Sequence, residues 1–200
     1  MSGTAPPRSG GHGYALVGVL LALLLFGTAA VLWFGGRAGQ AVGGGFTLRD
    51  PAGHVVHASD FRGKYMLVYF GYTHCPDVCP TTLTDVSAAL RAMGPKAAQV
   101  VPVFITVDPA RDTPAVMGRY AALFSRRIVA LSGSAAEIAH VAGEYHVYYA
   151  KHVTGPGPDD YSMDHSSVLY LMGPDGRFIA PLPADDAAPK LAAALERLIG

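Results

Sequence analysis

Residues 65–80 read YMLVYFGYTHCPDVCP, and this stretch joins two different structural patterns. Tyr65 to Phe70 is a continuous apolar run rich in aromatic side chains, which is typical of a strand buried on both faces. The run from Thr81 to Met93 that follows repeats its apolar residues at helical spacing, and Pro80 suits the first position of such a helix. The sequence therefore predicts a strand, a short loop and a helix, with two cysteines in or beside the loop.

The rest of the chain continues this alternation of strands and helices. We expect, in chain order, a strand at 100–107, a helix at 112–124, a strand at 128–131, a helix at 135–146, strands at 167–172 and 177–181, and a helix at 186–199. Gly173-Pro174-Asp175-Gly176 is a strong turn signal, so the last two strands should form a hairpin. This order predicts an α/β protein with a thioredoxin-like fold, a central mixed sheet flanked by helices.

An uncharged apolar run, YALVGVLLALLLFGTAAVLWF, occupies Tyr14 to Phe34. As a helix it would be about 31 Å long, which matches a hydrocarbon core of about 30 Å. A buried core helix would show a polar face, and this run shows none. A cleavable signal peptide is the alternative, because Gly27-Thr28-Ala29 resembles a cleavage site. The apolar run continues past that point to Trp33, a residue suited to a membrane interface, so we expect an uncleaved transmembrane anchor.

The anchor divides the chain into a short tail at 1–13, the span at 14–34, a Gly-rich flexible linker at 35–45 and a folded domain at 46–200. Such a domain is long enough for one core. Arg8 and Arg37 give only a slight positive-inside bias, which favours the tail inside and the domain outside. Without a transit-like leader, we expect a bacterial inner-membrane protein with a periplasmic domain.

The charge balance excludes one broad class of partner. Lys and Arg together number 15, as do Asp and Glu, so the formal net charge is zero. A neutral chain has no electrostatic footprint for nucleic acid or for an anionic membrane surface.

The chain has two cysteines, Cys75 and Cys79, and they form a Cys-x-x-x-Cys motif. This spacing is one residue longer than the Cys-x-x-Cys of dithiol redox enzymes. The start of a helix favours thiolate over thiol, and the thiolate is needed both for disulfide exchange and for metal binding. A purely structural disulfide is a weaker interpretation, because closing so small a loop contributes only about 2 kcal/mol.

Two thiolates leave a soft metal ion short of ligands, so a third ligand should exist. His165 lies in Tyr161–Ser166 (YSMDHS), which we interpret as a polar loop leading into a central strand. In a thioredoxin-like fold that loop faces the cysteine-bearing turn, which makes His165 the favoured third ligand. Met163 offers a soft thioether but is expected to pack. The remaining histidines are expected to be exposed or structural: His12, His54, His57, His74, His140, His146 and His152.

Three motifs together resemble the Sco (SenC) family. They are Phe70–Pro80 (FGYTHCPDVCP), Val107–Pro114 (VDPARDTP), and Asp164-His165-Ser166 followed by Gly173–Gly176 (GPDG). Members of that family are membrane-anchored, thioredoxin-like copper chaperones of cytochrome c oxidase assembly. The resemblance covers the chain from about Phe46 onward, and the N-terminal anchor fits it as well.

The resemblance implies that Cys75, Cys79 and His165 bind a copper ion, cuprous or cupric. It associates Asp164 with delivery of the metal, whereas a side chain adjacent to His165 on a strand would point the opposite way and suit a partner surface. Asp108, Arg111 and Asp112 match the second motif, and local charge pairs and a helix cap explain them adequately.

The implied function is delivery of copper to the binuclear copper centre of oxidase subunit II. The implied partners are that copper-bearing subunit, a copper donor chaperone and a thioredoxin-like reductant. The alternative is a thiol–disulfide oxidoreductase that reduces the cysteines of the same target, and the two roles are compatible. Thioredoxin-type reductants place a proline opposite the cysteines, where this chain has Asp164-His165-Ser166, which favours metal binding. A peroxidase would need a peroxidatic-cysteine context that the sequence lacks, and no enzymatic activity beyond thiol reduction is expected.

Overall fold

The computed structural model describes residues 23–28 and 42–200 of the chain. The chain divides into two units, Met1–Gln40 and Ala41–Gly200. Residues 23–28 are helical. Most of the anchor expected at 14–34, the tail and most of the linker lie outside the described residues. Within the two described ranges, no helix combines the length and the apolar character needed to cross a membrane.

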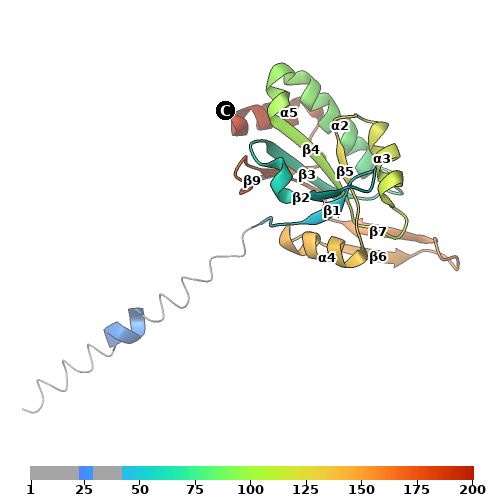
Figure 1. The fold of residues 1–200 in the computed structure, drawn as a ribbon, viewed down its shortest axis with the longest axis horizontal. Helices are drawn as coiled ribbons and strands as arrows, with labels where there is room; N and C mark the ends of the chain where they lie inside the picture. The colour runs from blue at the N-terminus through green and yellow to red at the C-terminus, as the bar shows by residue number, and fades with distance from the viewer. Residues whose placement is uncertain (1–22, 29–41) are drawn as a thin grey trace, which may run out of the picture. The chain divides into compact units, whose positions relative to one another are not determined.

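A five-stranded mixed sheet forms the centre of the second unit (Figure 1). Its strands, in spatial order, are β5 (Val129–Leu131), β4 (Val100–Thr106), β3 (Tyr65–Gly71), β8 (Val168–Met172) and β9 (Phe178–Pro183). β3 runs parallel to β4 and antiparallel to β8, and β9 completes the expected hairpin with β8. The central mixed sheet predicted from the sequence is confirmed.

Helices cover both faces of this sheet. They are α2 (Val78–Ala92), α3 (Pro114–Ala122), α4 (Ala135–Glu144) and α5 (Ala188–Ile199). α2 packs against α5, and Figure 1 shows this pair on one side of the sheet and α4 on the other. Two short 3-10 helices, Ala58–Phe61 and Gly94–Gln99, lead into β3 and β4.

Both faces of β3 are closed by aromatic side chains, as its apolar run predicts. Tyr69 stacks on Phe104 of β4, with ring centroids 5.9 Å apart. Its neighbour Phe70 points to the opposite face, where it packs against Tyr145 and Tyr170. Because successive strand residues alternate between faces, Tyr69 and Gly71 share one face. A strand fixed on both sides gives the cysteine loop a rigid point of departure at Gly71.

Two further strand pairs were not predicted. β1 (Thr47–Arg49) pairs with β2 (Val55–His57), and β6 (Tyr149–Val153) pairs with β7 (Tyr161–His165). The interpretation of 161–166 as a loop is therefore wrong, since all but its last residue belongs to β7. The physical reason is that this segment alternates buried and exposed residues with a period of two, which suits an antiparallel strand with one face covered.

Helix boundaries also differ in detail from the expectations. α2 begins at Val78, so Pro80 is its third residue rather than its first. Proline is tolerated there because the N–H groups of the first turn have no partner within the helix. The helix expected at 112–124 is α3, which starts two residues later, with Thr113 as its cap and Pro114 first, and ends at Ala122. α4 ends at Glu144, because His146 has a left-handed φ of 54° that a helix cannot continue through.

Candidate metal centre

Three side chains converge on one point: Cys75, Cys79 and His165, here called the Cys–Cys–His cluster. Their two sulfur atoms and one ring nitrogen all lie within 4.8 Å of one another. Cys75 lies in the loop after β3, Cys79 is the second residue of α2, and His165 is the last residue of β7. Cys79 is buried, whereas the other two are half-buried. The structure thus brings together the three residues that the sequence singled out as ligands.

The two thiols are not equivalent. The hydrogen bond with the Cys79 thiol lowers the pKa of Cys75 to about 3, and nearby backbone N–H groups act in the same direction, against burial. One of these contacts is the backbone N–H of Cys79, which donates to Cys75 Sγ at 3.4 Å. Cys75 is therefore a thiolate at neutral pH.

Cys79 behaves in the opposite way. Its hydrogen bond with Cys75, followed by burial, raises the pKa of Cys79 well above its ordinary value. The physical cause is that a second negative charge beside the Cys75 thiolate, away from water, is unfavourable. The metal-free pair accordingly holds one proton, which a metal ion would displace from Cys79.

The ring of His165 is held in one orientation. Its Nδ1 lies 3.2 Å from the carbonyl oxygen of Ser166, which can only accept, so Nδ1 carries the proton. The lone pair of Nε2 is then free, and Nε2 lies 3.4 Å from Cys79 Sγ. Tyr69 and Tyr72 pack their rings edgewise against the imidazole, with centroids 6.0 and 5.9 Å away. This is the arrangement in which metal-binding histidines are usually fixed.

Two residues of β3 shape the sulfur side of the cluster, and sequence reasoning missed both. A Cβ on Gly71 would lie 2.7 Å from Cys79 Sγ, so only glycine allows this sulfur to approach the strand. The hydroxyl of Tyr69 donates to Cys79 Sγ at 3.6 Å. Burial, followed by the nearby sulfur charge, raises the pKa of Tyr69, so its hydroxyl keeps its proton and acts as a donor. The only sequence signal for a common role of Tyr69 and Gly71 was their spacing of two residues, which places them on the same face of the predicted strand.

Asp112 ties the cysteine loop to the rest of the domain. Its fully buried carboxylate accepts hydrogen bonds from the backbone N–H and the hydroxyl of Thr73, and from Thr106 Oγ1 at 2.8 Å. The expectation that Asp112 needs only a local role is therefore too narrow, because it fixes the loop two residues before Cys75. No sequence pattern predicts this contact, because the two residues are 39 positions apart.

Arg111 and Asp108 reach β7 in a similar way. The Arg111 guanidinium pairs with the Asp108 carboxylate, donates to the carbonyl oxygen of Tyr161 at 3.1 Å and lies 3.6 Å from the Tyr161 ring centroid. The Tyr161 hydroxyl donates to Asp108 Oδ1 at 2.9 Å. These contacts hold the start of β7, and β7 carries His165 at its end. The second motif therefore stabilises the strand that carries His165, although none of the residues of this motif belongs to the Cys–Cys–His cluster.

The other candidate residues lie outside the cluster. Asp164 points away from His165, as strand alternation predicts, and its Oδ2 lies 2.7 Å from His152 Nε2 on the solvent side of the β6–β7 pair. Met163 is buried on the same face as His165, and its packing is consistent with a structural role. His74 is exposed and lies 4.0 Å from the carboxylate of Asp112.

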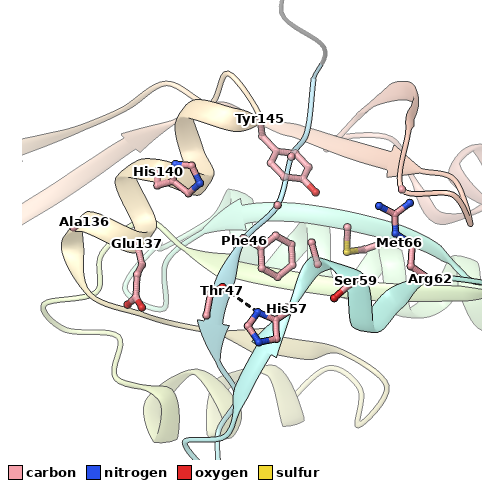
Figure 2. A pocket seen from close by; sticks show the side chains of 14 residues that line it. Phe46, Thr47, His57, Ser59, Arg62, Met66, Ala136, Glu137, His140 and Tyr145 are labelled. Atoms are coloured by element: carbon pink, nitrogen blue, oxygen red, sulfur yellow. Dashed lines mark hydrogen bonds between the residues drawn. The ribbon is translucent and has the colours of Figure 1, made fainter.

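A cavity of about 700 Å³ lies elsewhere in the domain (Figure 2). Figure 2 shows Phe46, Met66 and Tyr145 around it, with His57 hydrogen-bonded to Thr47 at its rim. A cavity of this size is large enough to be considered as a binding site. No member of the Cys–Cys–His cluster lines it, however, and its side chains do not converge as a set of metal ligands. We therefore assign the functional site to the cluster.

The chemistry of the cluster suits a soft metal ion. Two sulfurs and one imidazole nitrogen are the ligands that copper accepts in a trigonal site, and sulfur ligands in particular select cuprous ion. The residues present therefore fit copper.

Comparisons with known proteins agree with this geometry. The profile of the SCO1/SenC family matches residues 35–200. Protein sco1 of Schizosaccharomyces pombe is 43% identical over 157 residues, covering 77% of this chain and 59% of that protein. The mitochondrial SCO2 homolog of Bos taurus is 48% identical over 143 residues, covering 69% of this chain and 53% of that protein. The chain thus spans little more than half the length of these relatives.

Solved structures show the same fold. The structure of Bradyrhizobium japonicum ScoI with copper bound has a TM-score of 0.71 and 48% identity, covering 80% of this chain and all of that one. Yeast Sco1 with copper bound has a TM-score of 0.73 and 32% identity, covering 78% and 87%. The family profile, the sequence relatives and these structures lead to one assignment: the chain belongs to the SCO1/SenC family.

Proposed function

We propose that this protein binds one copper ion through Cys75 Sγ, Cys79 Sγ and His165 Nε2 and delivers it to the copper-bearing subunit of cytochrome c oxidase. The observation that carries the proposal is the convergence of these three ligand atoms within 4.8 Å. Support comes from relatives whose structures hold copper, those of Bradyrhizobium japonicum ScoI and yeast Sco1. Oxidase assembly follows from family membership.

The exposure of the cluster suits transfer rather than storage. Cys79 is fully buried and belongs to α2, so its sulfur is a fixed anchor for the ion. Cys75 and His165 are only half-buried and come from the loop and the strand end. An acceptor could therefore replace these two ligands first, from the solvent side. Asp164, exposed on the neighbouring surface, would contact such an acceptor.

The same proposal includes a membrane anchor at 14–34 and a periplasmic location for the folded domain. Its support is the uncharged apolar run of that segment, long enough for about 30 Å of hydrocarbon. An anchor would hold the copper site near a membrane-embedded oxidase. A Gly-rich tether such as 35–45 would let the domain turn toward its acceptor.

Thiol–disulfide exchange is the second candidate function, and the unequal thiols favour it. Cys75 is a half-exposed thiolate able to attack a disulfide, and Cys79 is a buried thiol beside it. In such a reaction, Cys75 would attack the target disulfide and release one target thiolate. The Cys79 proton would pass to that released thiolate, and the Cys79 sulfur would then attack Cys75 Sγ, breaking the mixed disulfide and releasing the second target sulfur as a thiolate. The target is thereby reduced to its dithiol, and Cys75–Cys79 becomes a disulfide.

Copper titration of the full-length protein tests the proposal. The wild type should bind one copper ion, and its cupric form should show strong sulfur-to-copper charge-transfer absorption. His165→Ala should lower the affinity at least 100-fold, because a ligand is lost rather than a supporting contact. His140→Ala, which removes an exposed histidine outside the cluster, is the matched control and should bind as the wild type does.

Unchanged stoichiometry and affinity in His165→Ala would refute the three-ligand site. An oxidase-assembly assay then separates the two functions. If His165→Ala supports assembly fully while Cys75→Ser does not, thiol exchange is the main role.

A further inference from the structure

The Tyr69 hydroxyl is aimed directly at one sulfur of the Cys–Cys–His cluster. Tyr69 is only 1% exposed, and its hydroxyl oxygen lies 3.6 Å from Cys79 Sγ. The ring cannot swing away, because it stacks on Phe104 on one side and meets the edge of His165 on another. A phenol that is fixed in this way offers its O–H to the sulfur permanently.

The environment makes this hydrogen bond strong. Cys79 is fully buried, and the surrounding β3, β4 and α2 side chains exclude water from its sulfur. In such a low-dielectric setting a hydrogen bond to an ionised sulfur is electrostatically stronger than the same bond in water. The Cys79 sulfur is ionised once a metal displaces its proton. The Tyr69 bond would therefore strengthen on metal binding.

A hydrogen bond to a thiolate ligand alters the metal as well as the ligand. It withdraws electron density from the sulfur, which then donates less electron density to the copper ion. The cupric form loses more stability from this than the cuprous form does. Hydrogen bonding around a cysteine sulfur is a recognised means of tuning the potential of copper sites. Tyr69 lies outside the ligand set, so its effect on the copper would pass through Cys79.

We propose that Tyr69 is a positioning residue that fixes the Cys79 sulfur and biases the bound copper toward the cuprous state. This inference rests on the proposed function, since it requires the cluster to hold copper. It goes beyond that function by assigning to the protein a built-in preference for one oxidation state, set by a single buried hydroxyl.

The test compares full-length wild type, Tyr69→Phe and Tyr145→Phe. Tyr145→Phe is the matched control, because Tyr145 is equally buried, its hydroxyl has no partner among the described residues, and it packs on the opposite face of β3. The measurements are the affinities for Cu(I) and Cu(II), the reduction potential and the absorption of the cupric form. Thermal melting of the copper-free proteins checks that each is folded.

For Tyr69→Phe we expect the ratio of Cu(I) to Cu(II) affinity to fall about tenfold, equivalent to a potential lower by about 59 mV. The sulfur-to-copper absorption should move to lower energy, since a sulfur without its hydrogen bond is easier to oxidise. Tyr145→Phe should match the wild type in both measurements. A second variant, Tyr69→3-fluorotyrosine, strengthens the donor and should shift the ratio in the opposite direction.

The outcomes distinguish the two proposals. If wild type and Tyr69→Phe bind copper with the same affinity ratio and the same absorption, the role of Tyr69 is refuted and the copper site stands. Equal shifts in Tyr69→Phe and Tyr145→Phe would also refute it, because the effect would then be general. If the wild type binds no copper, both proposals fail.

Discussion

At the scale of single residues, Gly71 sets the position of the Cys79 sulfur. A Cβ there would lie 2.7 Å from Cys79 Sγ and 3.0 Å from Phe104. Gly71→Ala should therefore force the sulfur or the ring to move, costing about 1–3 kcal/mol in the free energy of unfolding and weakening copper binding. Urea denaturation and copper titration measure the two effects.

The control for this change is Gly143→Ala in α4, where the new Cβ would meet nothing within 4 Å. Alanine favours a helix over glycine, so Gly143→Ala should leave stability unchanged or raise it by up to about 1 kcal/mol. Equal stability and equal copper affinity for Gly71→Ala and the wild type would contradict the close approach of Cys79 to β3.

Cys75 is the second residue whose behaviour can be predicted singly. Because the pKa of Cys75 is lowered to about 3, the copper-free reduced protein should carry the thiolate at every pH above about 4. The rate of Cys75 alkylation by iodoacetamide should then change little between pH 8 and pH 5, while Cys79 stays protected. In the unfolded chain the ordinary thiol pKa of about 8.5 returns, and the rate should fall with each pH unit below it.

Peptide mass spectrometry of samples alkylated for short times reports the two cysteines separately. A tenfold loss of Cys75 alkylation per pH unit below pH 8 in the folded protein would show that its pKa is not lowered.

At the scale of elements, the cysteine loop depends on a residue that follows a different strand. Asp112→Asn replaces an acceptor of three hydrogen bonds by an amide whose N–H₂ group would face the donors of Thr73 and Thr106. We expect a loss of about 2–3 kcal/mol in unfolding free energy, since buried donors are left without partners. Copper affinity should fall as well, because the loop that carries Cys75 loosens.

Thermal or urea unfolding measures this loss, and Asp159→Asn provides the comparison. Asp159 is exposed, and it contributes its backbone carbonyl rather than its carboxylate to Arg111. Its replacement should change stability by less than about 0.5 kcal/mol. If Asp112→Asn and Asp159→Asn had the same unfolding free energy, the hydrogen bonds between Asp112 and the cysteine loop would not contribute to stability.

The elements also show which patterns can be interpreted from sequence alone. β3 and β4 are continuous apolar runs, and the turn residues Gly173–Gly176 indicate the β8–β9 hairpin. These four strands were therefore predicted close to their observed bounds. β7 was missed because Ser162 and Asp164 make Tyr161–His165 look like a polar loop. The period-two alternation of that segment was the available signal, and it also places Met163 and His165 on one face.

At the scale of the whole molecule, the cluster joins segments 86 positions apart through the pairing of β3 with β8 and of β7 with β6. Residue type and spacing indicated the two cysteines, whereas His165 was selected among eight histidines by its place in the expected thioredoxin-like fold. The supporting roles of Tyr69, Gly71 and Asp112 were not predicted, because these roles arise only from packing between distant strands. Residue type together with the expected fold thus indicated the cluster, whereas the residues that support it were found only in the structure.

X-ray absorption at the copper edge of the copper-loaded full-length protein tests the central claim most directly. The three-ligand site predicts a shell of two sulfur atoms and one imidazole nitrogen around cuprous ion. His165→Ala should lose the imidazole scattering while both sulfurs remain. A shell without imidazole in the wild type, or an imidazole contribution that persists in His165→Ala, would contradict the site formed by Cys75, Cys79 and His165.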